Sequence, residues 1–296
     1  MDQAVIRELR PPATDGPGDA GIPTKSAAEE NFPVGSWLLP AALRPHIAAY
    51  YAFARAVDDI ADDPRRTAGA KIAELDAMEA ALRGKACPAA RDDDLRKAMR
   101  LRVSMIEAEV PITHGAELCI AFRQDAVKPR YRNWAELMEY CRYSAAPVGR
   151  FLLDLHGESD ATWPASDALC ASLQVINHLQ DCKKDFLEMD RVYLPLDWLD
   201  AAGAGTEHLA GAQATPALRA VLDRALDGIE DLNAQARALP ALIRNRRMRM
   251  EAAVIVAIAH RLARLLRERD PIAERVALSG FDKLACLIGG IWRALW

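Results

Sequence analysis

The sequence predicts an all-α protein. Ala, Leu and Arg, which are strong helix formers, are abundant, apolar residues recur at intervals of three and four, and strand-like alternation is rare. A chain of 296 residues can form one large domain or two small ones with an ample core. No internal repeat typical of a solenoid is present. We therefore expect roughly ten helices around one central cavity.

Proline and glycine divide the chain. Residues 1–28 are rich in both and are predicted to be a flexible tail, and 29–296 are predicted to be the folded domain. A connector with at most one short helix is expected over 196–215, with Thr215 as the N-cap of the helix that follows. The predicted helices span 47–62, 71–82, 92–109, 117–128, 134–155, the stretch between Pro164 and Arg191, 217–239, 241–268 and the C-terminal 280–296.

Two stretches place paired acids at the ends of otherwise apolar helices. Asp181 and Asp185 are four residues apart, which on a helix is one turn or about 6 Å. Asp58 and Asp62 repeat this spacing, with Asp59 and Asp63 as a parallel pair. For either stretch alone, a solvated helix face with intrahelical ion pairs explains the pattern equally well. Two such pairs are what several magnesium ions and one diphosphate require, because Mg²⁺ keeps several waters and takes phosphate oxygens as ligands.

Composition and net charge exclude several classes of function. The net charge of −4 and the pI near 5.9 argue against a nucleic-acid partner. The six cysteines lack a CxxC spacing, so we interpret them as core residues of a protein in a reducing compartment. The sequence holds no signal peptide, no uncharged apolar run of membrane-spanning length and no G-x-G-x-x-G segment. A cytoplasmic protein without bound NAD(P)H is therefore expected.

Four motifs occur in a fixed order: NFPVGSWLLP, the stretch around Asp58, YCRYSAAPVGR, and the stretch around Asp181 that ends in RVYLP. With these motifs, the chain resembles the squalene and phytoene synthases, the head-to-head prenyl synthases, from about Glu29 to the C-terminus. The ENFPVxSWLLP opening and the run from Ser144 to Arg150 are similar to the hydroxysqualene branch of hopanoid biosynthesis. The resemblance implies a single-domain isoprenoid (terpenoid) synthase fold.

The resemblance also implies roles for individual residues. Asp58, Asp62, Asp181 and Asp185 match the metal-binding aspartates of the family, and Tyr140 matches its functional tyrosine. The residues expected to bind diphosphate are Arg55, Arg191, Lys184, Tyr193 and Asn31. We expect apolar or aromatic cavity walls from Phe53, Tyr143, Val148, Leu152, Leu173 and Ile176. Tyr140, Asn177 and Gln174 are candidates for positioning a water, although each can equally be a hydrogen-bonded core residue.

The expected reaction is hydroxysqualene synthesis, which would make the enzyme a magnesium-dependent carbon–oxygen lyase. Presqualene diphosphate would ionise, the carbocation would rearrange, and one water would capture it without a reductant. One alternative is a synthase that condenses two prenyl diphosphates into presqualene diphosphate or phytoene. Another is a helical assembly factor without turnover. His178 beside Asn177 is either a base or, as a lone histidine on a helix usually is, structural.

The C-terminal residues could contact a membrane surface. Ile288, Ile291, Trp292, Leu295 and Trp296 could form an interfacial face on one side of a helix. The alternative is that this helix packs on the domain. In the first case the cytoplasmic protein would be peripheral to the inner face of the membrane, where it could be functionally coupled to neighbouring enzymes of the squalene pathway.

Overall fold

The computed structural model describes residues 40–85 and 92–295, and these are mostly helical. Within them the only strand-like feature is an isolated parallel bridge between Arg130 and Val192. The all-α prediction is confirmed. The chain forms two compact units, and the division falls within one helix. The first unit holds the described residues up to Val127 together with Arg150–Gly157, and the second holds Lys128–Gly149 and the residues from Glu158 onward. The expected tail, 1–28, lies outside the described residues.

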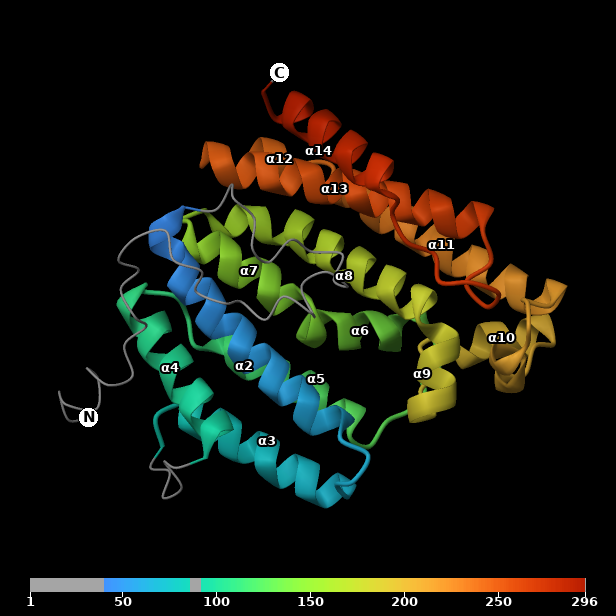
Figure 1. Ribbon diagram of the computed structural model, residues 1–296, viewed down its shortest axis with the longest axis horizontal. Helices are drawn as coiled ribbons and strands as arrows, with labels where there is room; N and C mark the ends of the chain where they lie inside the picture. The colour runs from blue at the N-terminus through green and yellow to red at the C-terminus, as the bar shows by residue number, and fades with distance from the viewer. Residues whose placement is uncertain (1–39, 86–91, 296) are drawn as a thin grey trace. The chain divides into compact units, whose positions relative to one another are not determined.

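The first unit is built on four helices after a short 3-10 turn, η1 (Ala41–Leu43). These are α2 (Arg44–Asp62), α3 (Ala68–Leu82), α4 (Asp93–Glu107) and α5 (Thr113–Asp125). Both α2 and α3 pack against α4 and α5 (Figure 1). Helix α2 ends where the sequence predicts, because Asp63 precedes Pro64 and adopts an extended conformation (φ −62°, ψ 110°).

A chain of contacts links α2, α5 and residues 150–157 within this unit. The Tyr50 ring stacks on Phe151 at 4.1 Å, and its hydroxyl donates to the backbone carbonyl of His114 at 3.0 Å. The His114 ring in turn lies 2.7 Å from the Asp154 carboxylate. These buried contacts fix α2, which carries the first aspartate pair, to the core of the unit.

The second unit contains the remaining helices. They are α6 (Trp134–Ser144), the start of α7 (Ala146–Leu155), η2 (Asp160–Thr162), α8 (Trp163–Gln180), α9 (Cys182–Met189), α10 (Leu196–Ala202), η3 (Thr206–Ala210), α11 (Pro216–Ala236), α12 (Leu239–Leu242), α13 (Arg246–Glu268) and α14 (Gly280–Leu295). Helix α8 is central, since it packs against α6, α11 and α13. Thr215 caps α11 as predicted, accepting the Leu218 amide at 3.2 Å.

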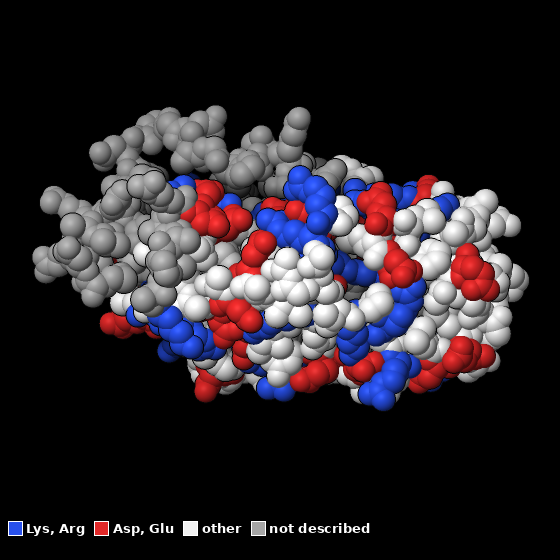
Figure 2. All heavy atoms as spheres, turned by 90° about the horizontal axis from the view of Figure 1, so that it is seen from below, with Lys and Arg blue, Asp and Glu red and all other residues white. Residues whose placement is uncertain are grey.

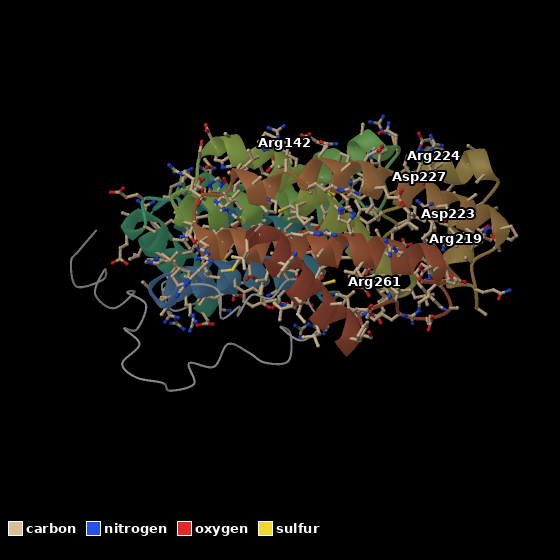
Figure 3. All side chains as sticks on the ribbon, turned by 90° about the horizontal axis from the view of Figure 1, so that it is seen from above. Arg142, Arg219, Asp223, Arg224, Asp227 and Arg261 are labelled. Carbon is tan, nitrogen blue, oxygen red and sulfur yellow. The ribbon has the colours of Figure 1, made fainter. Side chains whose placement is uncertain are left out.

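Helices α11 and α13 are also joined by surface ion pairs. Arg219, Asp223 and Asp227 follow one another along α11 (Figure 3). Arg267 of α13 reaches Asp227 at 2.7 Å and Glu230 at 2.9 Å. Exposed pairs of this kind contribute at most about 1 kcal/mol each, so the apolar contacts carry most of the stability.

The single helix predicted over 134–155 is wrong. The chain leaves helical dihedrals at Ala145 (φ −123°, ψ −45°) and restarts as α7 at Ala146. The cause is Pro147, which has no N–H to donate to the preceding turn and whose ring would clash with the carbonyl four residues earlier. The break places Pro147 in the first turn of the new helix, where neither penalty applies.

Acidic and basic side chains are interspersed over the face of the described residues seen in Figure 2. Among these residues, no helix is both long and apolar enough to cross a membrane.

Helix α14 lies along α13 at the edge of its unit (Figure 1). The approach is close at Gly290, where an added Cβ would lie 2.6 Å from the Cα of Val254. Only a residue without a side chain fits there. The preceding residue, Gly289, has nothing within 4 Å of such a Cβ.

We predict that Gly290→Ala lowers the free energy of unfolding by roughly 1–3 kcal/mol, because the new methyl group forces α14 away from α13. Gly289→Ala is the matched control and should be neutral or raise stability by about 0.5 kcal/mol, since alanine is the better helix former. Urea unfolding followed by circular dichroism measures both. Equal effects of the two substitutions would contradict the close approach.

Candidate active site

The first acidic cluster lies on the last two turns of α2. One face of this helix is buried, and Asp58 and Asp62 lie off that face, each only partly exposed. The Arg55 guanidinium lies 3.2 Å from Asp58 and 2.8 Å from Asp59. In the structure this predicted phosphate ligand is therefore shared between two carboxylates, and half of its side chain is exposed.

The carboxylate of Asp58 lies in an environment that disfavours its negative charge. Its pKa is raised to about 7, first because the group is withdrawn from water and then because of the carboxylates of Asp62 and Asp125. Arg55 opposes this shift but does not cancel it. A bound cation would relieve the crowding of negative charge.

Asp63, the last acid of this stretch, has a structural role. Asp63 accepts from Arg65 at 2.8 Å and from Arg66 at 2.7 Å, and these contacts hold its pKa below the ordinary range. Nearby, Lys71 donates to the carbonyl of Ala61 at 2.7 Å, a contact with the end of α2 that the sequence did not indicate. Of the two parallel pairs, Asp58 and Asp62 are thus the pair suited to a metal.

The second acidic cluster lies where α8 gives way to α9. The helix predicted up to Arg191 is not continuous, because Asp181 leaves helical dihedrals (φ −107°, ψ 7°). The Asp185 amide nevertheless donates to the Asp181 carbonyl at 2.8 Å, so the two acids keep their one-turn relation. Asp185 is buried and Asp181 is partly exposed. Arg275, which the sequence gave no reason to select, approaches Asp181 at 3.6 Å.

The basic residues of this stretch have different environments. Lys183 donates to the carbonyls of Gly211 at 2.8 Å and Ile272 at 3.3 Å, so it ties α9 to two loops. Lys184 is exposed, whereas Arg191 is only 8% exposed, and its amide donates to the Asp185 carbonyl at 3.0 Å. Arg191 and Lys184 therefore remain the candidates for phosphate contacts.

Asp190 sets the turn that brings Arg191 back toward the acids. Its backbone is left-handed (φ 52°), a conformation that aspartate tolerates better than most residues. The side chain of Arg130 reaches both the carbonyl and, at 2.6 Å, the carboxylate of Asp190. Just beyond the turn, the Val192 amide donates to the carbonyl of Pro129 at 2.9 Å. This segment is held in place by the chain that precedes α6.

Four rings form a buried aromatic cluster in the second unit. The His178 ring stacks on Tyr193 at 3.6 Å with an interplanar angle of 13°. Tyr140 lies 5.7 Å from Tyr193 and 5.3 Å from Tyr131. The cluster unites two residues selected from the sequence, Tyr140 and Tyr193, with two that were not selected as site residues.

His178 is neutral at physiological pH. Its pKa is lowered to about 3 because the ring is buried and because the Arg191 charge is close. The ring nitrogen lies 3.2 Å from the amide nitrogen of Gln174, so the neutral imidazole accepts that hydrogen bond. The histidine thereby fixes the Gln174 amide. Asn177, the third water-positioning candidate, is exposed.

The predicted cavity residues are distributed over both units. Phe53 and Leu152 are buried in the first unit and Ile176 in the second. The second unit also contains Tyr143, Val148 and Leu173, which are partly exposed. That these residues line one cavity stays a prediction. Asn31 lies outside the described residues.

The donor chemistry fits magnesium. Each acidic cluster supplies two carboxylates one turn apart. The crowding of negative charge around Asp58 favours binding of a cation there. Within 40–85 and 92–295 no group of three or more Asp, Glu, His or Cys side chains is arranged to hold a metal by itself. Ions held by one or two carboxylates would complete their shells with water and substrate phosphate.

Fold and site together define an all-α protein with an acidic cluster in each of its two units. The family model for squalene/phytoene synthase matches residues 26–282. The chain belongs to the squalene/phytoene synthase family.

Individual relatives agree with this assignment. The hydroxysqualene synthase of Rhodopseudomonas palustris is 45% identical over 267 residues, which are 90% of this chain and 89% of the relative. The phytoene synthase of Mycobacterium tuberculosis is 32% identical over 274 residues, covering 88% and 85%. The solved structure of squalene synthase HpnC from Alicyclobacillus acidocaldarius has a TM-score of 0.70 and 28% identity, covering 90% of this chain and 92% of that one.

The raised pKa of Asp58 predicts a pH-dependent cost to stability. An unfolded aspartate titrates at 3.8 and the folded one at about 7, so the native state binds the extra proton between these values and loses stability as the pH rises. Without magnesium, Asp58→Asn should raise the free energy of unfolding at pH 8 by roughly 1–2 kcal/mol, a value discounted because the side chain is 34% exposed. The gain should fade below about pH 7 and vanish near pH 4.

Urea unfolding across this pH range measures the effect of Asp58→Asn. Asp59→Asn is the matched control, since Asp59 is 59% exposed, and it should show no such pH-dependent gain. A gain at Asp58 that does not change with pH would rule out proton linkage.

We also predict that the His178 imidazole stays neutral from pH 8 down to about pH 5. Nitrogen NMR of the labelled imidazole measures this directly. In urea the same ring should titrate near pH 6.5, because burial and Arg191 no longer act on it. Titration in the folded protein with that ordinary midpoint would exclude the buried, hydrogen-bond-accepting role.

Proposed function

We propose that the protein is a hydroxysqualene synthase, converting presqualene diphosphate and water to hydroxysqualene and diphosphate. The observation that carries the proposal is the pair of acidic clusters, Asp58 with Asp62 and Asp181 with Asp185, in a chain 45% identical to a relative of that name. The reaction breaks the carbon–oxygen bond to the diphosphate and forms a new one to water, which releases a proton. It needs no reductant and hence no NAD(P)H.

The charged residues would act on the leaving group. The four aspartates would hold several magnesium ions, and the bound metal would neutralise the negative charge that grows on the departing diphosphate. Arg55, Arg191 and Lys184 would donate to phosphate oxygens. Arg191 suits this role because it is buried beside the second acidic cluster, where an arginine is strongly attracted to an anion. Tyr193 and Asn31 complete the proposed set.

The apolar residues would protect the carbocation. Once the diphosphate departs, a cation reacts with any water that reaches it before it has rearranged. Phe53, Leu152 and Ile176, with the partly exposed Tyr143, Val148 and Leu173, would provide dry walls. Only one water would then be admitted to the rearranged cation.

The position of that water would be set by a few polar groups. Tyr140 and Gln174 belong to the same unit as the second acidic cluster, and Asn177 lies on the same helix as Gln174. The hydrogen bond from Gln174 to neutral His178 directs the amide. His178 is thus a positioning residue in this scheme. A pKa near 3 makes it a weak base for removing the proton of the water.

A second candidate is a synthase that condenses two prenyl diphosphates, since a relative named phytoene synthase is 32% identical. The higher identity to the hydroxysqualene synthase favours the first proposal. A helical assembly factor without turnover is disfavoured because all four aspartates are retained. We further propose that the enzyme works in the cytoplasm, peripheral to the inner face of the membrane and coupled to neighbouring squalene-pathway enzymes, because its substrate and product are too apolar for water.

Product identification tests the reaction. With magnesium and presqualene diphosphate in H₂¹⁸O, the product should be hydroxysqualene that contains one heavy oxygen, detected by mass spectrometry. Farnesyl diphosphate alone should remain unreacted. Consumption of farnesyl diphosphate without conversion of presqualene diphosphate would instead establish the condensing enzyme.

Asp58→Ala and Asp181→Ala should each lower kcat by about a thousandfold or more, because each removes charge compensation at the leaving group. Asp76→Ala, at an exposed acid of α3 paired with Arg123, is the control and should retain activity. Turnover and circular dichroism are measured together. Wild-type turnover of either site variant would exclude the assigned role.

A further inference from the structure

Helix α14 presents a row of large apolar side chains to solvent. Phe281, Leu284, Ile288, Trp292 and Leu295 are 79%, 53%, 61%, 65% and 44% exposed. Their spacing of three or four residues places them on one side of the helix. The opposite side holds the buried Asp282, Cys286, Gly290 and Ala294. One side of the helix is therefore buried, and the other exposes large apolar side chains.

The helix pair that carries this row is basic in a chain whose net charge is −4. Helix α13 contains six arginines against two glutamates. A groove of about 390 Å³ runs between α13 and α14, lined by His260, Arg261, Arg264 and Arg293 above small residues such as Ala257 and Ala285. Arg261 pairs with Asp282 at 2.7 Å, whereas Arg264 and Arg293 are exposed.

The basic residues continue to the end of the apolar row. Asp282 meets Arg261, and Gly290 meets Val254, so the two helices run antiparallel. The C-terminal end of α14 therefore lies toward the N-terminal turn of α13, where Arg246 and Arg247 are exposed (Figure 1). Arg261 lies beside α14 in the view of Figure 3. Positive charge thus flanks the apolar row along its length.

We propose that this hairpin of α13 and α14 docks the protein on an anionic phospholipid bilayer. Exposed Trp, Phe, Leu and Ile on one helix face, with arginines beside them, is the pattern of helices that lie in the membrane interface. The apolar row enters the boundary between headgroups and acyl chains. The arginines of the groove bind headgroup phosphates, with which a guanidinium forms strong, charge-assisted hydrogen bonds.

The positive charge of the hairpin favours an anionic bilayer over a second copy of the chain as its binding partner. In a symmetric dimer across this face, the same arginines of both copies would be brought together, and like charges disfavour association. An anionic bilayer carries the opposite charge, so it can bind both the apolar row and the arginines beside it. The inference does not depend on the proposed reaction, because bilayer binding is measured without substrate.

Flotation of the full-length protein with vesicles tests the inference. Recovery should be high with phosphatidylcholine vesicles containing phosphatidylglycerol, lower with phosphatidylcholine alone, and should fall as salt is added. The double variant Ile288→Glu, Trp292→Glu should lower the partition coefficient at least tenfold on both vesicles. The double variant Arg264→Glu, Arg293→Glu should lower it severalfold on the anionic vesicles only.

Matched controls lie on α4, which is not part of the hairpin. Ile106→Glu replaces an apolar side chain that is 52% exposed, and Arg100→Glu reverses an exposed charge. Both should float like the wild type, and circular dichroism should show every variant folded. Failure of the wild type to float, or equal effects of hairpin and control substitutions, would overturn the inference. So would light scattering that shows a wild-type dimer converted to monomer by Ile288→Glu, with no flotation of either.

Discussion

The crowding of carboxylates one helical turn apart, at Asp58 with Asp62 and at Asp181 with Asp185, is the constraint on which the rest of the structure depends. Asp58 and Asp62 lie in the last turns of α2, which has no basic residue in its final turn, whereas Asp181 lies between α8 and α9 and Asp185 lies in the first turn of α9. The C-terminal end of a helix is itself partially negative, so carboxylates are disfavoured there. At Asp58, burial first and then the carboxylates of Asp62 and Asp125 raise the pKa to about 7. We propose that a bound cation relieves this crowding of negative charge.

Several basic residues close to these carboxylates bind other groups. In the first unit, Arg65 and Arg66 are directed to Asp63, and Lys71 contacts a backbone carbonyl. In the second, Lys183 is likewise bound to two carbonyls. Several nearby cations are thus committed to structural contacts. We propose that magnesium and substrate supply the remaining charge compensation.

Much of the fold followed from sequence pattern because its signals are local. The end of α2 was predicted from Pro64, and the start of α11 from Thr215 and Pro216. The break at Ala145 was missed although Pro147 was visible, because the apolar pattern continues through it. The break at Asp181 was also missed, yet the predicted one-turn relation of Asp181 and Asp185 survives, because the amide of one donates to the carbonyl of the other.

Spacing and resemblance single out candidate site residues, whereas residues brought together only by tertiary contacts give no local signal. Arg275 reaches Asp181 from 94 positions along the chain, and Asp125 acts on Asp58 from another helix, so no local pattern indicates either. The sequence alone leaves two roles open for His178, a catalytic base or a structural residue. Burial against Tyr193 and the nearby Arg191 decide for a neutral, structural ring, and neither is visible in the sequence.

We propose that Asp58, Asp62, Asp181 and Asp185 all contribute to binding magnesium diphosphate. Calorimetric titration of magnesium in the presence of inorganic diphosphate, with Asp58→Asn, Asp181→Asn and the double variant, tests it most directly. One shared site predicts that the two substitutions are strongly non-additive when diphosphate is present and additive when it is absent. Additive effects under both conditions would show that the clusters bind independently and would contradict the account.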